Sequence, residues 1–293
     1  MRDHFGRKVN YLRISITDLC NLRCVYCMPE EGVPKRRHAT NLSFEEIEAL
    51  VRAGADMGID KIRLTGGEPL VRAGVLDLVK KLGAIPGIRD FAMTTNGILL
   101  PEMAADLKAA GLRRVNISLD TFDPEKYARI TRCGRLEDAL AGIDAAVAAG
   151  LTPLKINTVL IKGFNDDEIE AFVHYTKTRP VEVRFIELMP LGDGAEYAFG
   201  QYMPGEAVLA RVPELVPAAS PPGAPARLCT LPGALGKVGL INPISHRFCS
   251  DCNRIRLTAD GKLKPCLHSD EELDVKALRR AGRSYREILE MAG

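Results

Sequence analysis

The chain has 293 residues, of which 46% are apolar and 27% are charged, and its 40 basic and 38 acidic side chains leave a formal net charge of +2. This composition is typical of a globular protein with a large core. The near-neutral charge excludes a general affinity for nucleic acid or anionic membranes, and no apolar stretch is long enough to span a bilayer. The N-terminal sequence lacks the apolar core of a secretory signal, so we expect a cytoplasmic protein.

The first two thirds of the chain alternate between strand-like and helix-like patterns. Ser43 and Glu46 form a capping-box sequence before an apolar run, which predicts the start of a helix. Six strand–helix units in succession are typical of an α/β fold built on a parallel sheet. The expected strands lie near residues 11–16, 61–65, 91–95, 114–119, 154–160 and 182–188.

This rhythm ends after Met189. Residues 213–226 contain five prolines, a composition that favours an extended connector with few hydrogen bonds. Short strands and turns are expected over 227–266 and helical sequence over 274–291. We therefore predict a first domain over 1–200 and a smaller C-terminal domain over 201–293.

Polar residues occupy one face of several expected strands. Alternation separates Arg13, Arg63 and Lys155 from their apolar neighbours. A sheet wrapped by helices is expected to be apolar on both faces, so the polar face predicts the lumen of a partial (βα)6 barrel of the TIM type. Because an unpaired buried cation is strongly disfavoured, the three side chains predict an anionic ligand in that lumen. Internal pairing with Asp or Glu is the alternative.

Six of the eight cysteines form two groups of three, each containing a Cys-x-x-Cys pair. In a reducing compartment this spacing indicates metal or redox chemistry. Three thiolates without a fourth can hold three corners of an iron–sulfur cube and leave one iron open, whereas a structural zinc site normally needs four ligands. The first group is Cys20, Cys24 and Cys27, and the second is Cys249, Cys252 and Cys266.

The second group has two interpretations. It could be a zinc knuckle completed by His246 or His268. Strand alternation directly after the Cys-x-x-Cys pair sends Arg254 and Arg256 to one side, beside the metal, and arginine suits bidentate contacts to phosphates and purines. The second interpretation is therefore a cationic cluster domain facing a cationic lumen.

The first cysteine group, followed by Gly66-Gly67-Glu68-Pro69 after the second strand, resembles the radical S-adenosylmethionine enzymes. The resemblance implies that the open iron chelates S-adenosylmethionine and that its reduction gives methionine and a 5′-deoxyadenosyl radical. It also implies cofactor contacts, which are Tyr26 against adenine, the loop residues Gly66, Gly67, Glu68 and Pro69, and the strand-end residues Ser118 and Met189. For the last two, a strand-end turn and core packing are the alternatives.

Nearly the whole chain, from about 5 to 280, resembles one group of these enzymes, the GTP 3′,8-cyclase family of molybdenum cofactor biosynthesis. The resemblance includes residues 11–18, 61–65 and 94–97 and the second cysteine group. It implies two 4Fe-4S clusters, S-adenosylmethionine, and GTP as the substrate. The GTP contacts implied are Arg13, Arg63, Thr94 and Lys155 from the barrel and Arg254, Ile255 and Arg256 from the C-terminal part.

In that family hydrogen is removed from the ribose C3′ and the resulting radical attacks guanine C8. The resemblance thus implies formation of (8S)-3′,8-cyclo-7,8-dihydroguanosine 5′-triphosphate, the first step of molybdenum cofactor biosynthesis. An electron-donor protein is an expected partner, and a homodimer is one assembly that the sequence leaves open. Two alternatives are a twin-cluster radical enzyme acting on a peptide and a non-catalytic zinc-binding module. The cationic side chains argue against a peptide, which needs no anion cradle.

Two further features complete the expectations. Cys133 and Cys229 have no partner by spacing and are expected to be packing residues. Members of the resembled family end in a Gly-Gly tail, whereas this chain ends at Gly293. From that difference we expect a truncated form, impaired turnover or a different substrate.

Overall fold

The computed structural model describes residues 1–293 except 5, 34–40, 191–194, 222, 268–270 and 293. His268 and Gly293, both named in the sequence expectations, therefore lie outside the described residues. Within the described part, no helix has the length and apolar character needed to cross a membrane.

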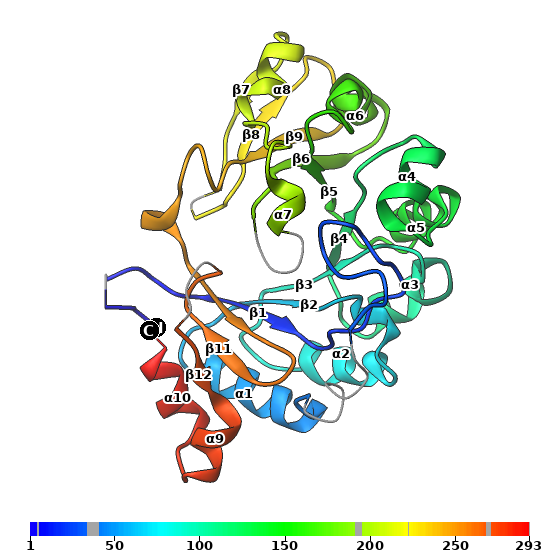
Figure 1. Ribbon diagram of the computed structural model, residues 1–293. Helices are drawn as coiled ribbons and strands as arrows, with labels where there is room; N and C mark the ends of the chain where they lie inside the picture. The colour runs from blue at the N-terminus through cyan, green and yellow to red at the C-terminus, as the bar shows by residue number, and fades with distance from the viewer. Residues whose placement is uncertain (5, 34–40, 191–194, 222, 268–270, 293) are drawn as a thin grey trace.

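Six parallel strands from the first two thirds of the chain are neighbours in chain order, which confirms the predicted α/β fold. Each observed boundary lies within one residue of the expected one. Figure 1 shows these strands as a curved sheet, with the helices that connect them along its outer side. The strands are β1 (Tyr11–Ser15), β2 (Lys61–Thr65), β3 (Asp90–Thr95), β4 (Arg114–Ser118), β5 (Leu154–Leu160) and β6 (Val181–Glu187).

Capping side chains begin two of the α-helices that follow these strands. Ser43 and Glu46 form the predicted capping box at the start of α1 (Phe44–Asp56), and Asp123 caps α4 (Pro124–Thr131) by accepting from two backbone N–H groups. The apolar strand faces pack against the helices; Leu12, Ile62 and Ile156 have no exposed surface. The elements are α1 (Phe44–Asp56), η2 (Pro69–Val71), α2 (Val75–Gly83), α3 (Leu100–Ala109), α4 (Pro124–Thr131), α5 (Leu136–Ala148), η3 (Asp166–Glu168) and α6 (Ile169–Thr178).

The C-terminal part adds strands to both edges of the same sheet. Strand β9 (Lys237–Ile241) runs parallel to β6, and β10 (Arg254–Leu257) runs parallel to β1 at the opposite edge. Residues 242–253 connect the two edges and carry η5 (Cys249–Asp251). The remaining elements are α7 (Ala195–Ala198), α8 (Glu206–Arg211), β7 (Val216–Ala218), β8 (Arg227–Thr230), β11 (Lys262–Lys264), β12 (Leu273–Asp274), α9 (Val275–Arg280) and α10 (Tyr285–Met291).

The proline-rich segment differs from the expected connector in one respect. Its residues Val216–Ala218 form β7, which pairs with β8 at the edge of the sheet. An edge strand tolerates Pro217, because proline lacks only a backbone donor that an edge does not need. Strands from both sides of residue 200 belong to one sheet, so the domain boundary expected near that residue stays a prediction.

Candidate active site

The first cysteine group lies in the loop after β1, at the carboxyl end of the parallel strands. The loop after β2 meets it directly, because Gly67 N donates to Thr17 O and Glu68 N donates to Leu19 O, both at 2.7 Å. From the loop after β3, Asn96 Nδ2 donates to Asn21 Oδ1 at 2.7 Å and lies 3.9 Å from Cys20 Sγ. Three loops thus converge at the edge where parallel barrels carry their function.

The glycine pair after β2 is required by this close approach. A Cβ on Gly66 would lie 2.4 Å from Thr17 O, and a Cβ on Gly67 would lie 2.2 Å from Leu19 O. Gly66 also has φ +155°. A side chain at either position would displace the cysteine loop. Both glycines are therefore needed for the packing of the two loops, in addition to their predicted contact with the cofactor.

The Glu68 carboxylate is engaged by the protein itself. It accepts from Leu70 N at 3.0 Å, Thr95 Oγ1 at 2.8 Å and Asn96 N at 2.7 Å. Burial raises its pKa, while these three donors act in the opposite direction. Glu68 therefore joins the loops after β2 and β3, and any support that it gives to the cofactor comes through the backbone it fixes.

Tyr26 is held by a buried carboxylate that the sequence analysis did not identify. Its hydroxyl donates to Asp120 Oδ2 at 2.5 Å, and Asp120 Oδ1 accepts from Val159 N at 2.8 Å. Burial raises the pKa of Asp120 to about 6, although both donors lower it. Asp120 follows β4 two residues after Ser118, so its position after a strand was the available signal.

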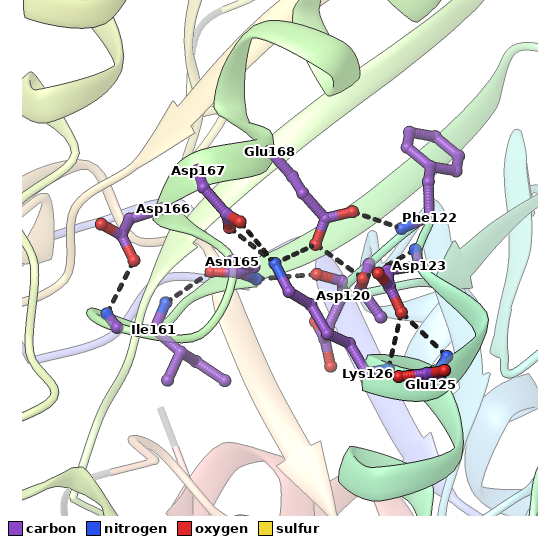
Figure 2. A network of polar contacts seen from close by, with 12 residues as sticks. Asp120, Phe122, Asp123, Glu125, Lys126, Ile161, Asn165, Asp166, Asp167 and Glu168 are labelled. Carbon is purple, nitrogen blue, oxygen red and sulfur yellow. Dashed lines mark hydrogen bonds and ion pairs between the residues drawn. The ribbon is translucent and has the colours of Figure 1, made fainter.

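A polar network behind Asp120 joins the loops after β4 and β5 (Figure 2). Asn165 Nδ2 donates to Asp120 O at 2.7 Å, and its Oδ1 accepts from Ile161 N at 2.9 Å. Lys126 on α4 donates to Asp167 at 2.7 Å and to Glu168 at 3.3 Å. These contacts fix the position of Asp120, which accepts the hydrogen bond from the Tyr26 hydroxyl.

The turn between α4 and α5 fastens the cysteine loop from outside. Arg132 Nη1 donates to Arg23 O at 2.8 Å and to Met28 O at 3.1 Å, and two further backbone bonds join residues 23 and 25 to 131 and 130. Among the described non-glycine residues, Arg132 alone has a left-handed backbone, with φ +64°. A strained conformation of this kind persists where surrounding contacts require it, and here they are contacts to the cysteine loop.

The two remaining cysteines behave differently. Cys229 is buried, as expected, with 3% of its surface exposed. Cys133 is exposed in the α4–α5 turn, so the expectation that it is a packing residue is wrong. The pKa of Cys24 is raised mainly by burial and by the Asp120 carboxylate, and a Cys133 thiolate would raise it further. Cys133 therefore lies near the first cysteine group, a tertiary proximity that its sequence spacing does not reveal.

The second cysteine group lies at the amino end of the strands. Cys249, Cys252 and Cys266 line a cavity of about 370 Å³ together with the first residues of β1 to β4. Arg7 Nη1 donates to Cys249 O at 2.6 Å. The two groups thus face the barrel from opposite ends.

The donor chemistry of both groups fits iron–sulfur clusters. Each offers three thiols, and His246, one residue considered for a zinc knuckle, is exposed and does not line the cavity. No three His, Cys, Asp or Glu side chains of the described ranges converge on a position for a single metal ion. Three thiols, each able to bind one iron, suit a cluster that leaves its fourth iron open.

The cavity between the groups is strongly cationic. Its lining has eight basic side chains, and Asp90 is the one acidic side chain among these described residues. The sheet register places Arg13 beside both Arg63 and Arg256. The basic side chains are Arg13, Lys61, Arg63, Arg114, Lys155, Arg184, Arg254 and Arg256.

Two of the predicted anion contacts lack a carboxylate partner in the described ion pairs. Arg13 Nε and Arg63 Nε are buried and have no hydrogen-bond partner among the described residues. Burial, followed by repulsion from Arg256 and Arg63, lowers the pKa of Arg13 to about 9. Arg63 Nη1 donates to Thr94 Oγ1 at 3.4 Å. These orphaned donors fit an anionic ligand.

Lys155 differs, because it has an internal partner. Its Nζ lies 3.2 Å from a Glu182 carboxylate oxygen, and Arg184 Nε contacts the same carboxylate at 2.5 Å. Arg114 pairs with Asp90 at 2.7 Å. Internal pairing, the alternative raised from the sequence, therefore applies to Lys155 but leaves the central arginines free for a ligand.

The other predicted contacts are placed as follows. Met189 lines the cavity, and Ser118 ends β4 toward the cysteine loop. Ile255 is 2% exposed and packs in the core, so only its backbone can reach a ligand. The polar strand faces are evident from the sequence, but several residues that line the cavity were not predicted as site residues. These are Tyr11, Lys61, Arg114, Asn116, Asn157 and Arg184.

Comparison with known proteins agrees with this arrangement. The model of the radical SAM superfamily matches residues 14–176, and that of Molybdenum Cofactor Synthesis C matches residues 181–292. A GTP 3′,8-cyclase of Alkaliphilus oremlandii is 53% identical over 293 residues, covering 100% of this chain and 92% of the relative. The chain belongs to the radical SAM superfamily and to its GTP 3′,8-cyclase family.

Other members and structural neighbours support the assignment. The GTP 3′,8-cyclase of Pelotomaculum thermopropionicum is 54% identical, covering 98% of this chain and 90% of that protein. Streptococcus suis SuiB bound to S-adenosylmethionine superposes with a TM-score of 0.67 over 96% of this chain and 68% of its own, at 14% identity. At that identity SuiB shows the radical SAM fold alone.

The Arg132 contacts generate the first prediction. Arg132→Ala removes two hydrogen bonds to the cysteine loop, each contributing about 1 kcal/mol. We expect the first cluster to lose iron to a chelator several-fold faster, with the second cluster unaffected, as followed by iron analysis and EPR. Arg135→Ala is the control, since that side chain is 75% exposed and pairs only with Glu137 in the described ion pairs, at 3.7 Å. Equal rates for both variants would contradict the role given to Arg132.

Proposed function

We propose that the chain catalyses the S-adenosylmethionine-dependent cyclisation of GTP to (8S)-3′,8-cyclo-7,8-dihydroguanosine 5′-triphosphate, the first step of molybdenum cofactor biosynthesis. The relatives named GTP 3′,8-cyclase match along nearly their whole length. The observation that carries the proposal is the cavity, which eight basic side chains line together with the second trio of thiols. A nucleoside triphosphate is an anion that such a lining would stabilise.

The residues at each end would hold the two clusters and the cofactor. Cys20, Cys24 and Cys27 would hold the first cluster, and Cys249, Cys252 and Cys266 the second. Gly66 and Gly67 let their loop pack directly against the cysteine loop, and Tyr26, fixed by Asp120, offers an aromatic face. S-adenosylmethionine bound at the first cluster supplies, on one-electron reduction, the means to remove a hydrogen atom from an unactivated carbon.

The protein contributes charge and orientation. Arg13, Arg63 and Arg256 present neighbouring guanidiniums to the triphosphate. Arg254 lies over the Phe248 ring, 5.0 Å from its centroid, beside the second cysteine group. Fixing the nucleotide at both ends aligns its ribose and base for a reaction that joins C3′ to C8 within one molecule.

We further propose an external electron donor, because the reduction needs electrons that the chain itself does not supply. Free thiols at all eight cysteines fit a reducing compartment, which supports a cytoplasmic location. A homodimer remains a proposal that sedimentation analysis can test.

The decisive assay uses anaerobically reconstituted protein with reductant, S-adenosylmethionine and GTP. We expect 5′-deoxyadenosine and a cyclised purine isomeric with GTP, resolved by chromatography with mass detection. Cys24→Ala should abolish 5′-deoxyadenosine, whereas Cys249→Ala should retain the first cluster but form no cyclised product. Zinc without iron in the wild-type protein, or no cyclised product from a fully loaded sample, would contradict the proposal.

The lowered pKa of Lys155 predicts a pH dependence of GTP binding. Burial and the neighbouring Arg184 lower its pKa to about 8, so it loses its charge as the pH rises through that value. An anion binds more tightly to the protonated lysine, and we expect GTP affinity to fall several-fold between pH 7 and 9. In Lys155→Arg the side chain stays charged and the fall should shrink. An identical profile in both proteins would show that Lys155 does not contact the nucleotide.

A further inference from the structure

Two asparagines on neighbouring barrel strands interrupt the cationic lining of the cavity. Asn116 on β4 and Asn157 on β5 both line it. Asn116 has no exposed surface and its Nδ2 has no partner among the described residues, while its Oδ1 accepts from Arg114 Nη1 at 3.3 Å. The Oδ1 of Asn157 is likewise buried and unpartnered within the described structure. The two amides therefore leave one donor group and one acceptor unsatisfied in the lumen, which is costly unless a ligand pairs with them.

The sheet register places these amides between the two halves of the site. Asn157 pairs with Ser118, the strand-end residue expected to contact the cofactor, and Asn116 pairs with Lys155 one step closer to the amino end. On its other side Asn116 pairs with Thr94, so the neutral polar positions are contiguous. Lys155 and Arg184 are at the same levels as the two amides, paired with Asn116 and Asn157 respectively, and the other basic side chains of the lining are closer to the amino end.

The position and chemistry of the pair together identify what it binds. A hydrogen atom that passes from the nucleotide sugar to the cofactor requires the sugar to lie where the two halves of the site meet. A ribose hydroxyl both donates and accepts, as the two amides require, whereas a phosphate would prefer the cations.

We propose that Asn116 and Asn157 bind the ribose hydroxyls of the nucleotide and make the site select a ribonucleotide over its deoxy analogues. This inference rests on the proposed function, since it takes GTP as the occupant of the cavity. A site built to pair with a hydroxyl rejects the analogue that lacks it, because the buried amide is then left unpaired.

The test is equilibrium binding to the anaerobic protein with both clusters loaded, without S-adenosylmethionine or reductant, so that no turnover occurs. The probes are GTP, 2′-deoxyGTP and 3′-deoxyGTP. We expect the wild-type protein to prefer GTP roughly 10-fold or more over at least one analogue. Asn116→Ala and Asn157→Ala should each weaken GTP binding by about that factor, while leaving the affinity for the analogue that lacks the matching hydroxyl within about twofold.

Ile156→Val is the matched control, because Ile156 is fully buried on the opposite face of β5. It should keep the wild-type preference. Asn116→Ser and Asn157→Ser repeat the test with a smaller loss of polarity if an alanine variant does not fold. Variants that weaken all three nucleotides equally, or that keep the wild-type ratio, would overturn the inference. A wild-type protein that binds none of the three would contradict the proposed function itself.

Discussion

The buried positive charge of the lumen is the constraint on which the rest of the site depends. Arg13 lies between Arg63 and Arg256 in the sheet register, and the Nε atoms of Arg13 and Arg63 are buried without partners among the described residues. Removing charges from water without a counter-charge is strongly disfavoured, and the lowered pKa of Arg13 reflects that cost. A polyanionic ligand offsets it, which links the stability of the barrel to its substrate.

The topology separates two kinds of chemistry along the barrel axis. The loops after β1, β2 and β3 bring the first cysteine group to the carboxyl end of the strands. The connection from β9 to β10 brings Cys249 and Cys252 to the amino end. Because β9 and β10 extend opposite edges of one sheet, the C-terminal part forms side walls of the cavity and also closes it at the amino end of the strands.

Local signals were sufficient for the first six strands, for the capping box at Ser43 and for the grouping of the cysteines into trios, because periodicity and spacing record them directly. The attachment of β10 to β1 depends on pairing between residues at opposite ends of the chain, which alternation within either strand does not specify. The contacts of Arg132, Asp120 and Glu182 also join residues that are distant in the sequence, so the sequence pattern did not predict them. The core position of Ile255 follows from alternation once Arg254 and Arg256 face the cavity, so the contact with GTP that the family resemblance implies for Ile255 would be made by its backbone.

The most direct test of the central claim is the melting temperature of the anaerobic, cluster-loaded protein with GTP and with guanosine at matched concentrations. A ligand that binds only the folded state raises that temperature, and at equal concentration the tighter ligand raises it more. If the lumen charge requires a polyanion, GTP will raise the melting temperature by several degrees, guanosine will raise it far less, and added salt will weaken the GTP effect. Equal shifts for the two ligands, or no shift with GTP, would contradict the account.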